Sequence, residues 1–180
     1  MPDALPQSGT IPQRIADAVA GDRGQLARLL TDLERAGATS AEASAGLYEH
    51  LTGVGVIGLT GPPGAGKSTL VDALVRVLRK QDLRIAIIAV DPSSPVSGGA
   101  ILGDRVRMSA AISDDGIFVR SLSASGHTGG IAPAAVRMID AFDAAGYDRV
   151  IIETVGTGQS EIDIAEIADV RVVVAAPGLG

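Results

Sequence analysis

Cysteine is absent from the 180 residues, and lysine occurs only twice, at Lys67 and Lys80. The absence of cysteine excludes disulfide bonds and thiolate metal sites, and it fits a reducing compartment. Basic residues are also in the minority, since 15 Lys and Arg against 21 Asp and Glu give a formal net charge of −6. A surface that binds nucleic acid needs a basic face, so the composition argues against a nucleic-acid partner.

Long apolar runs are absent as well. The longest, such as 85–90 and 172–177, are far too short to span a bilayer. Residues 1–11 have neither the basic start nor the apolar stretch of a secretory signal. With 46% hydrophobic and 20% charged residues, the chain is long enough for one globular domain with a sizeable core. We therefore expect a soluble, cytoplasmic protein with no membrane partner.

Residues 61–69 read GPPGAGKST and complete the pattern G-x-x-x-x-G-K-[ST]. They follow the apolar run 54–60 and precede the amphipathic stretch 70–81, so the pattern has the strand–loop–helix context of a phosphate-binding loop. The glycines let backbone N–H groups surround a polyphosphate, and a helix beginning near Ser68 adds the positive end of its dipole. The alternative is a glycine-rich turn in a chain with 23 glycines, but one of the two lysines falls on the required position. The predicted nucleotide-binding residues are Gly61, Pro62, Pro63, Gly64, Ala65, Gly66, Lys67, Ser68 and Thr69.

Residues 12–51 have an approximate helical period of leucine, isoleucine and valine, with breaks at Gly21 and Gly37. Ser40, with an acidic residue in the next turn, predicts the start of a third helix that runs toward Leu51. We expect a small helical layer, residues 1–52, that packs on a P-loop core, residues 53–180.

From residue 54 onward, apolar runs alternate with helical patterns. One helix is predicted at 131–145, closed by Gly146, and another from an N-cap at Ser160 through Ala168. The apolar runs are rich in Val and Ile with little polar alternation, which is typical of strands buried on both faces of a parallel sheet. This pattern predicts a doubly wound, mostly parallel α/β sheet with ligands at the carboxyl ends of its strands. The predicted strands are 54–60, 84–90, 117–121, 148–153 and 170–176.

Two carboxylates follow buried strands, Asp91 after 85–90 and Glu153 after 150–152. In a parallel sheet both lie on the edge that carries the phosphate loop, where Mg²⁺ would take carboxylate and hydroxyl oxygens as ligands. The alternatives are that Asp91 starts a turn and that Glu153 is a solvated strand end. Asp104 ends a segment rich in Ser, Pro and Gly, and it either closes on Mg²⁺ or forms a surface pair with Arg105.

The segment that follows Glu153 has the pattern of a switch that senses a γ-phosphate. The backbone N–H of Gly156 would contact the phosphate, and residues 157–161 would move with it. In well-studied GTPases a glutamine follows this glycine and orients the attacking water. Here Thr157 occupies that position and the nearest glutamine is Gln159, so intrinsic hydrolysis should be slow and should rise with a partner. The alternative is that Gln159 is already correctly placed and that hydrolysis is fast without a partner. The predicted catalytic residues are Lys67, Asp104, Glu153 and Gln159.

Four stretches resemble the methylmalonyl-CoA mutase chaperones (the MeaB, ArgK and MMAA group), P-loop GTPases whose third motif begins with glutamate. They are GPPGAGKST at 61–69, DPSSPVSGGAILGDRVRM at 91–108, ETVGTGQSE at 153–161 and PGLG at 177–180. The resemblance implies that GTP or GDP is the ligand. It also implies that the chain is a GTP hydrolase. The Mg²⁺ site that it implies is formed by Ser68, Asp91, Asp104 and Glu153.

The resemblance further implies a partner, an adenosylcobalamin-dependent acyl-CoA mutase whose cofactor loading the chaperone gates. The adenosylcobalamin belongs to that partner. The family pattern continues through an N-K-x-D motif that reads guanine and a helical arm used for homodimerisation. Neither occurs in these residues, so we expect the sequence to be C-terminally incomplete, and a homodimer is expected for the full-length form. Two other functions remain open, an ATP-dependent kinase of the transport-associated type and a non-catalytic interaction module.

Overall fold

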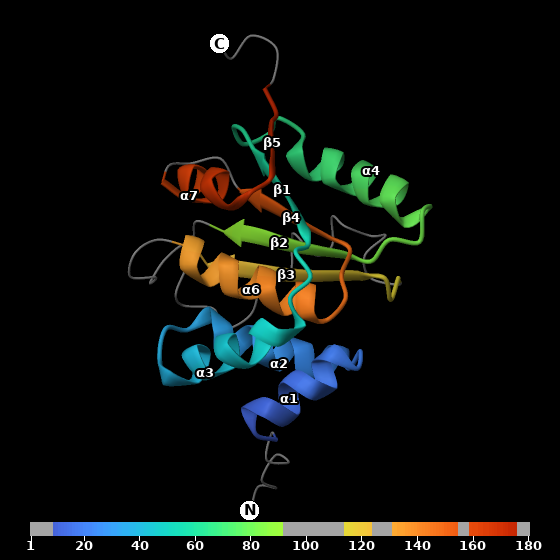
Figure 1. Cartoon of the computed structure of the whole chain (residues 1–180). Helices are drawn as coiled ribbons and strands as arrows, with labels where there is room; N and C mark the ends of the chain where they lie inside the picture. Colours follow the sequence, from blue (N-terminus) through green and yellow to red (C-terminus); the bar gives the residue numbers. More distant parts are fainter. Residues whose placement is uncertain (1–8, 92–113, 124–130, 155–158, 176–180) are drawn as a thin grey trace, which may run out of the picture.

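A parallel five-stranded sheet forms the centre of the molecule (Figure 1). The structure is a computed structural model and describes residues 9–91, 114–123, 131–154 and 159–175. Every strand pair runs parallel, in the order β3-β2-β4-β1-β5. This confirms the doubly wound α/β fold. The strands are β1 (Gly55–Thr60), β2 (Ile85–Asp91), β3 (Ile117–Ser123), β4 (Arg149–Thr154) and β5 (Val170–Val173).

Strand positions were predicted to within about two residues, except at the end of β5. The sequence predicts a strand through residue 176, but β5 ends at Val173. The Val174 N–H still donates to the Thr60 carbonyl at 2.8 Å. Within the described residues β5 pairs only with β1, and three of its four side chains are exposed, so little packing holds a longer strand in place.

Alternate residues of the sheet enter two separate cores. Ile85 and Ile87 of β2 pack in one cluster with Val71 and Val75 of α4 (Lys67–Arg79). The intervening β2 residues pack in a second cluster with α6 (Ala132–Ala144) and α7 (Gln159–Ile167). Helices therefore cover both faces of the sheet, which explains why its strands read as nearly continuous apolar runs.

The predicted helical layer consists of α1 (Ile11–Val19), α2 (Arg23–Glu34), α3 (Ala38–Leu47) and the short 3-10 helix η1 (Tyr48–His50). Gly21 and Gly37 separate the first three helices, as predicted, and Gly21 has a φ of 100°. The predicted start at Ser40 is wrong. α3 begins at Ala38, and the Ser40 hydroxyl bonds back to the Gly37 N–H and carbonyl at 3.1 and 2.9 Å, so it closes the first turn from inside the helix.

This layer packs on α6 and shares its core. Buried leucines of α2 lie in the same cluster as Phe142 of α6 and Ile152 of β4. Arg23 adds a polar link, donating to the Ile117 carbonyl at 2.8 Å, and Arg120 donates to Glu34 at 2.8 Å. The helical layer is therefore continuous with the sheet by both apolar packing and hydrogen bonds.

The helices after the third strand follow the sequence pattern closely. α6 spans Ala132–Ala144, and Gly146 follows it with a φ of 74°, as the pattern predicts. For α7 the predicted N-cap is wrong, because the helix begins at Gln159 and Ser160 is its second residue. An N-cap residue has non-helical backbone angles, whereas Ser160 is helical. No described helix is long and apolar enough to cross a membrane.

Candidate functional site

The loop between β1 and α4 contains residues 61–66, and three of its glycines have left-handed backbone angles. Gly61, Gly64 and Gly66 have φ values of 138°, 79° and 96°. A Cβ on Gly61 would lie only 2.1 Å from the Val174 carbonyl oxygen, so the approach of the chain after β5 leaves no room for a side chain. The backbone can therefore turn sharply at the carboxyl end of β1 and direct the N-terminus of α4 toward the space above the loop.

Lys67 is the first residue of α4 and only 6% of its surface is exposed. Its ammonium group donates to the Gly61 carbonyl at 2.6 Å and to the Pro62 carbonyl at 2.9 Å. Lys67 is the only buried lysine in the described part of the chain, and hydrogen bonds to two loop carbonyls keep its ammonium group beside the loop. A polyphosphate bound there would meet a positive charge that is already in place.

Ser68 and Glu153 come together although 85 positions separate them. The Ser68 hydroxyl donates to Glu153 Oε1 at 2.5 Å, and Glu153 is buried. The sheet explains the contact, because β4 lies between β1 and β2 and Glu153 pairs in register with Leu59. Both predicted residues therefore lie at the edge where the phosphate loop begins.

The donor set fits Mg²⁺. A hydroxyl and a carboxylate oxygen are hard ligands, and Mg²⁺ in nucleotide sites takes one or two protein oxygens and completes its shell with water and phosphate. Within the described ranges no group of three or more Asp, Glu or His side chains is placed to hold a metal by itself.

The other predicted residues are placed only in part. Asp91 is the last residue of β2, one position beyond the Val90–Thr154 pair, so its backbone lies at the same sheet edge as Glu153. Gln159 is the first residue of α7. The side chains of both, and all of Asp104 and Gly156, lie outside what the structure describes. Their roles stay predictions.

Thr154 was missed by the sequence reasoning. It follows Glu153 and is fully buried, and its hydroxyl lies 3.4 Å from the Leu59 carbonyl and 3.3 Å from the Thr60 hydroxyl. It therefore connects the end of β4 to the end of β1, between the carboxylate and the phosphate loop. The sequence does contain a signal for this contact, because β1 and β4 both end in a threonine, Thr60 and Thr154.

Comparison with known proteins identifies the family. The family profile described as methylmalonyl-CoA mutase-associated GTPase MeaB matches residues 26–180. The chain belongs to this family. The match includes the phosphate loop, Glu153 and every strand of the sheet, while α1 lies before it.

Curated relatives agree with this assignment. A putative GTPase of Pyrococcus abyssi is 46% identical over 160 residues, which is 89% of this chain and 49% of the relative. GTPase ArgK of Escherichia coli is 41% identical over 164 residues, 89% of this chain and 50% of the relative. This MeaB-family chain thus spans about half the length of these relatives. A fused isobutyryl-CoA mutase of Cupriavidus metallidurans is 43% identical over 174 residues, 94% of this chain and 16% of that protein.

A solved structure supports the fold. The crystal structure of an LAO/AO transport system kinase superposes with a TM-score of 0.74 at 29% identity, covering 96% of this chain and 52% of the other. The coverage includes the helical layer as well as the sheet, so the N-terminal helices belong to the shared architecture.

Proposed function

We propose that this MeaB-family protein is a Mg²⁺-dependent GTPase that serves an adenosylcobalamin-dependent acyl-CoA mutase. The observation that carries the proposal is the Ser68–Glu153 contact beside a phosphate loop with a buried lysine. Family membership and the GTPase names of the relatives support GTP as the nucleotide. The mutase is methylmalonyl-CoA mutase or a relative of it.

Each residue has a distinct role in the proposed reaction. Lys67 binds the β- and γ-phosphates of GTP and offsets the charge that develops during transfer. Ser68 and Glu153 would hold Mg²⁺, which would supply positive charge to offset the phosphate charge that develops during transfer. Asp91 and Asp104 support the same site, in keeping with the position of Asp91 at the end of β2.

The proposed switch follows β4. The Gly156 N–H contacts the γ-phosphate, and Gln159, at the start of α7, orients the attacking water once a partner orders the segment. Because Thr157 replaces the glutamine of well-studied GTPases, intrinsic hydrolysis is slow and the mutase raises it. The nucleotide state therefore reports whether the partner is bound.

The names of relatives support the choice of partner. The family description itself is mutase-associated, and a mouse relative, 42% identical over 69% of this chain and 30% of its own length, is named for methylmalonic aciduria type A. In the fused isobutyryl-CoA mutase a homologous segment shares one chain with a mutase. We propose that the protein gates adenosylcobalamin loading, that the cofactor resides on the mutase, and that the protein acts as a cytoplasmic homodimer.

Hydrolysis of GTP and ATP by a full-length form that carries the guanine-reading motif, measured with and without methylmalonyl-CoA mutase, tests this function. Single-turnover rates should be low with GTP alone and should rise on addition of the mutase. The name of the matching transport system kinase favours a second candidate, an ATP-dependent kinase. Faster turnover of ATP than of GTP would support that candidate. If neither nucleotide is hydrolysed with any mutase, the protein is a non-catalytic interaction module.

A further inference from the structure

A groove lies between α1 and α3, in the helical layer. These helices lie at the opposite end of the molecule from α4 and the phosphate loop (Figure 1). The groove has a volume of about 470 Å³, within the range of roughly 300–1,000 Å³ that is usual for ligand pockets. The function proposed above does not use it. The groove is lined by Ile11, Pro12, Ile15, Ala16, Val19, Glu42, Gly46, Glu49 and His50.

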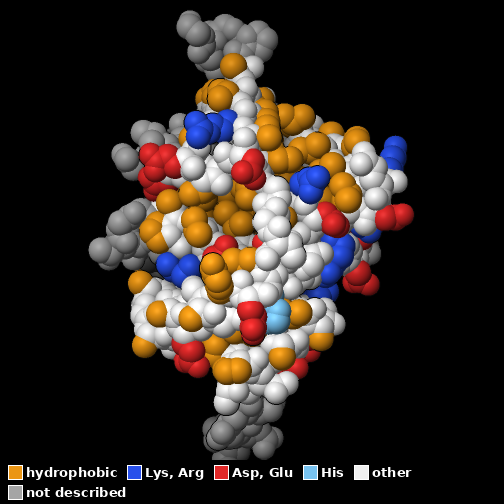
Figure 2. All heavy atoms as spheres, in the orientation of Figure 1, with side chains coloured by type: hydrophobic (Ala, Val, Ile, Leu, Met, Phe, Trp, Pro, Cys, Tyr) orange, Lys and Arg blue, Asp and Glu red, His pale blue; other side chains and the backbone are white. Residues whose placement is uncertain are grey.

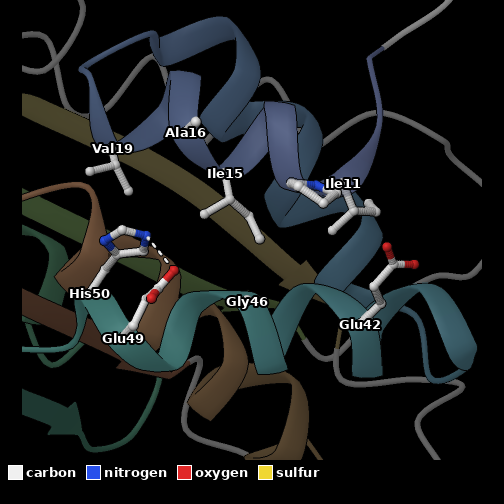
Figure 3. Close-up of a pocket in the computed structure, with 9 residues that line it drawn as sticks. Ile11, Ile15, Ala16, Val19, Glu42, Gly46, Glu49 and His50 are labelled. Carbon is white, nitrogen blue, oxygen red and sulfur yellow. Dashed lines mark ion pairs between the residues drawn. The ribbon is translucent and has the colours of Figure 1, made fainter.

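Figure 3 shows how two helices build the groove. Ile11, Ile15 and Val19 descend from α1 at intervals of four residues, and residues 42, 46 and 50 lie below them in the same order. α1 and α3 therefore run side by side in the same direction, and aliphatic side chains line the groove from end to end. Glu42 lies at one end, and Glu49 with His50 lies at the other.

Gly46 shapes the middle of the groove. A Cβ at this position would lie 2.7 Å from the Cδ1 atom of Ile15, closer than real contacts allow. Gly46 lies within α3, where glycine costs about 1 kcal/mol relative to alanine, and its φ is not in the left-handed region. A larger residue at this position would therefore displace the end of the Ile15 side chain. With glycine present, backbone forms this part of the groove.

The ends of the groove carry negative charge that these helices do not neutralise. Glu42 and Glu49 are seven residues apart, roughly 11 Å along a helix axis. The Glu49 side chain is 80% exposed, and its contact with His50, at 3.7 Å, is an ion pair only when the imidazole is protonated. α1 has one cation, Arg14, which is buried against Asp32, and α3 with η1 has no Lys or Arg.

Further apolar surface continues beyond the groove along the same helix. Ala41 and Ala45 of α3 are exposed, and Tyr48 of η1 is 79% exposed. Figure 2 shows an acidic and a histidine side chain next to one another amid apolar side chains in this lower part of the molecule. Tyrosine is enriched at protein interfaces, so the exposed Tyr48 adds one large side chain that a partner could cover.

We propose that this face, which we call the α1–α3 groove, docks an amphipathic helix of a partner protein. The apolar side chains of that helix pack over the partly buried Ile11 and Val19 and the exposed Ala16. Two Lys or Arg side chains, two turns apart, pair with Glu42 and Glu49. An amphipathic helix binds an apolar groove through apolar anchors at i, i+3, i+4 and i+7 of its own sequence. The two glutamates, seven positions apart, would face cations that flank this apolar stripe at a similar separation. The acidic ends exclude a helix with acidic flanks and select a basic one.

A synthetic peptide provides the probe. An alanine-based helix of about 18 residues, long enough to be partly helical, would carry leucines on one face and two lysines seven residues apart. A second peptide would have glutamates in place of the lysines. Titration of the ¹⁵N-labelled protein should shift amide signals of residues 11–19 and 42–50. The lysine peptide should bind about tenfold or more tightly than the glutamate peptide, because two ion pairs are gained and two repulsions removed.

Two variants and a control complete the test. The double variant Glu42→Lys/Glu49→Lys should reverse the preference between the peptides, and Ala16→Arg, at an exposed groove position, should weaken binding of the lysine peptide at least tenfold. Ala73→Arg makes the same change on the exposed face of α4 and should bind the peptide like the wild type. Circular dichroism checks the fold of each variant, and the charge reversal alone suffices if Ala16→Arg does not fold.

Three results would overturn the proposal: equal binding of both peptides, signal shifts outside the groove, or unchanged binding in the charge-reversed variant. Self-association of the wild type that Ala16→Arg abolishes would also overturn it, because a second copy of the chain would then be the occupant. Nucleotide affinity, measured in the same samples, should be unchanged. The inference therefore stands or fails separately from the proposed GTPase function.

Discussion

Lys67 places a buried positive charge at the phosphate loop. Its charge is buried in a chain with a single other lysine, Lys80, which is exposed at the end of the same helix. Burying an ammonium group is costly unless it is hydrogen-bonded, and here two loop carbonyls supply the bonds. A phosphate ligand would give this charge a stronger partner than two neutral carbonyls.

The first prediction concerns this lysine. Lys67→Ala should weaken binding of a non-hydrolysable GTP analogue by about 10- to 100-fold, because one hydrogen-bonded charge is lost from the phosphate site. Lys80→Ala removes the same charge and side chain outside the site and should bind like the wild type. Isothermal titration calorimetry of both variants decides the matter, and equal affinities would place the phosphates elsewhere.

The second prediction concerns Glu153 and its neighbour. Glu153→Gln keeps the size of the side chain but removes its charge, so nucleotide affinity should lose most of its dependence on Mg²⁺. Ser68→Ala should act in the same direction. Titrations at low and at millimolar Mg²⁺ measure this dependence, and an unchanged dependence in both variants would exclude the pair from the metal site.

The third prediction concerns Thr154, which the structure identifies as a positioning residue. Thr154→Val has nearly the same shape but loses the hydroxyl between β4 and β1, so it should weaken Mg²⁺-dependent nucleotide binding several-fold without unfolding the protein. Thr154→Ser keeps the hydroxyl and should restore binding. If valine and serine behave alike in both affinity and Mg²⁺ dependence, the hydroxyl has no positioning role.

At the scale of elements, α6 binds the segment that connects the helical layer to β1. Asp143 of α6 accepts hydrogen bonds from the Thr52 N–H at 2.9 Å, the Thr52 hydroxyl at 2.6 Å and the Gly53 N–H at 2.8 Å. Burial raises the pKa of Asp143, but these hydrogen bonds outweigh it and the net shift is downward. The pKa of Asp140, one turn earlier, is raised by burial and by the negative charge of Asp143.

Opposite pKa shifts predict opposite effects of neutral substitutions. Because Asp143 has a lowered pKa in the folded state, its carboxylate stabilises the fold above the unfolded pKa of about 3.9, and this contribution is lost as the pH falls through the folded value. Asp143→Asn should therefore destabilise the protein by about 1–3 kcal/mol at pH 7 and by less at acid pH. Asp140→Asn should stabilise it at pH 7. Chemical denaturation at a series of pH values from 7 down to about 2 tests both signs, because the folded pKa of Asp143 lies below its ordinary value.

At the scale of the molecule, one hydrophobic cluster joins the helical layer to the sheet. Leu29 and Leu30 of α2 are fully buried in the same cluster as Phe142 and Ile152. The division into residues 1–52 and 53–180 describes the order of the elements along the chain. With a shared core, however, we expect the two parts to unfold together.

The last prediction tests this cooperativity. Leu29→Ala should cost about 2–5 kcal/mol, as buried leucine truncations do, and should lower the midpoint of a single unfolding transition. Thermal unfolding followed by far-ultraviolet circular dichroism and by ¹⁵N signals of β2 should give the same midpoint. Two transitions, with the sheet signals unaffected by Leu29→Ala, would show that the helical layer and the sheet fold independently.

The sequence by itself predicted most of the elements and indicated a nucleotide as the ligand. The phosphate-loop pattern, the glycines at helix ends and the buried apolar runs are local signals, because each depends on backbone angles or periodicity over a few residues. They placed four strands, α4 and α6 closely, and they singled out Lys67, Ser68 and Glu153. The starts of α3 and α7 were misplaced because a serine in the first turn of a helix resembles an N-cap in sequence.

Only the tertiary structure decided which distant groups meet. The sequence predicts Ser68 and Glu153 at one edge of the sheet, and the structure adds the direct hydrogen bond between them. The contact of Thr154 with Thr60 comes from strand register and was not predicted. The same holds for Gly61, whose lack of a side chain is required by the Val174 carbonyl, and for Gly46, which is packed against Ile15. Such contacts depend on how whole elements pack, so a local pattern contains no information about the partner atom.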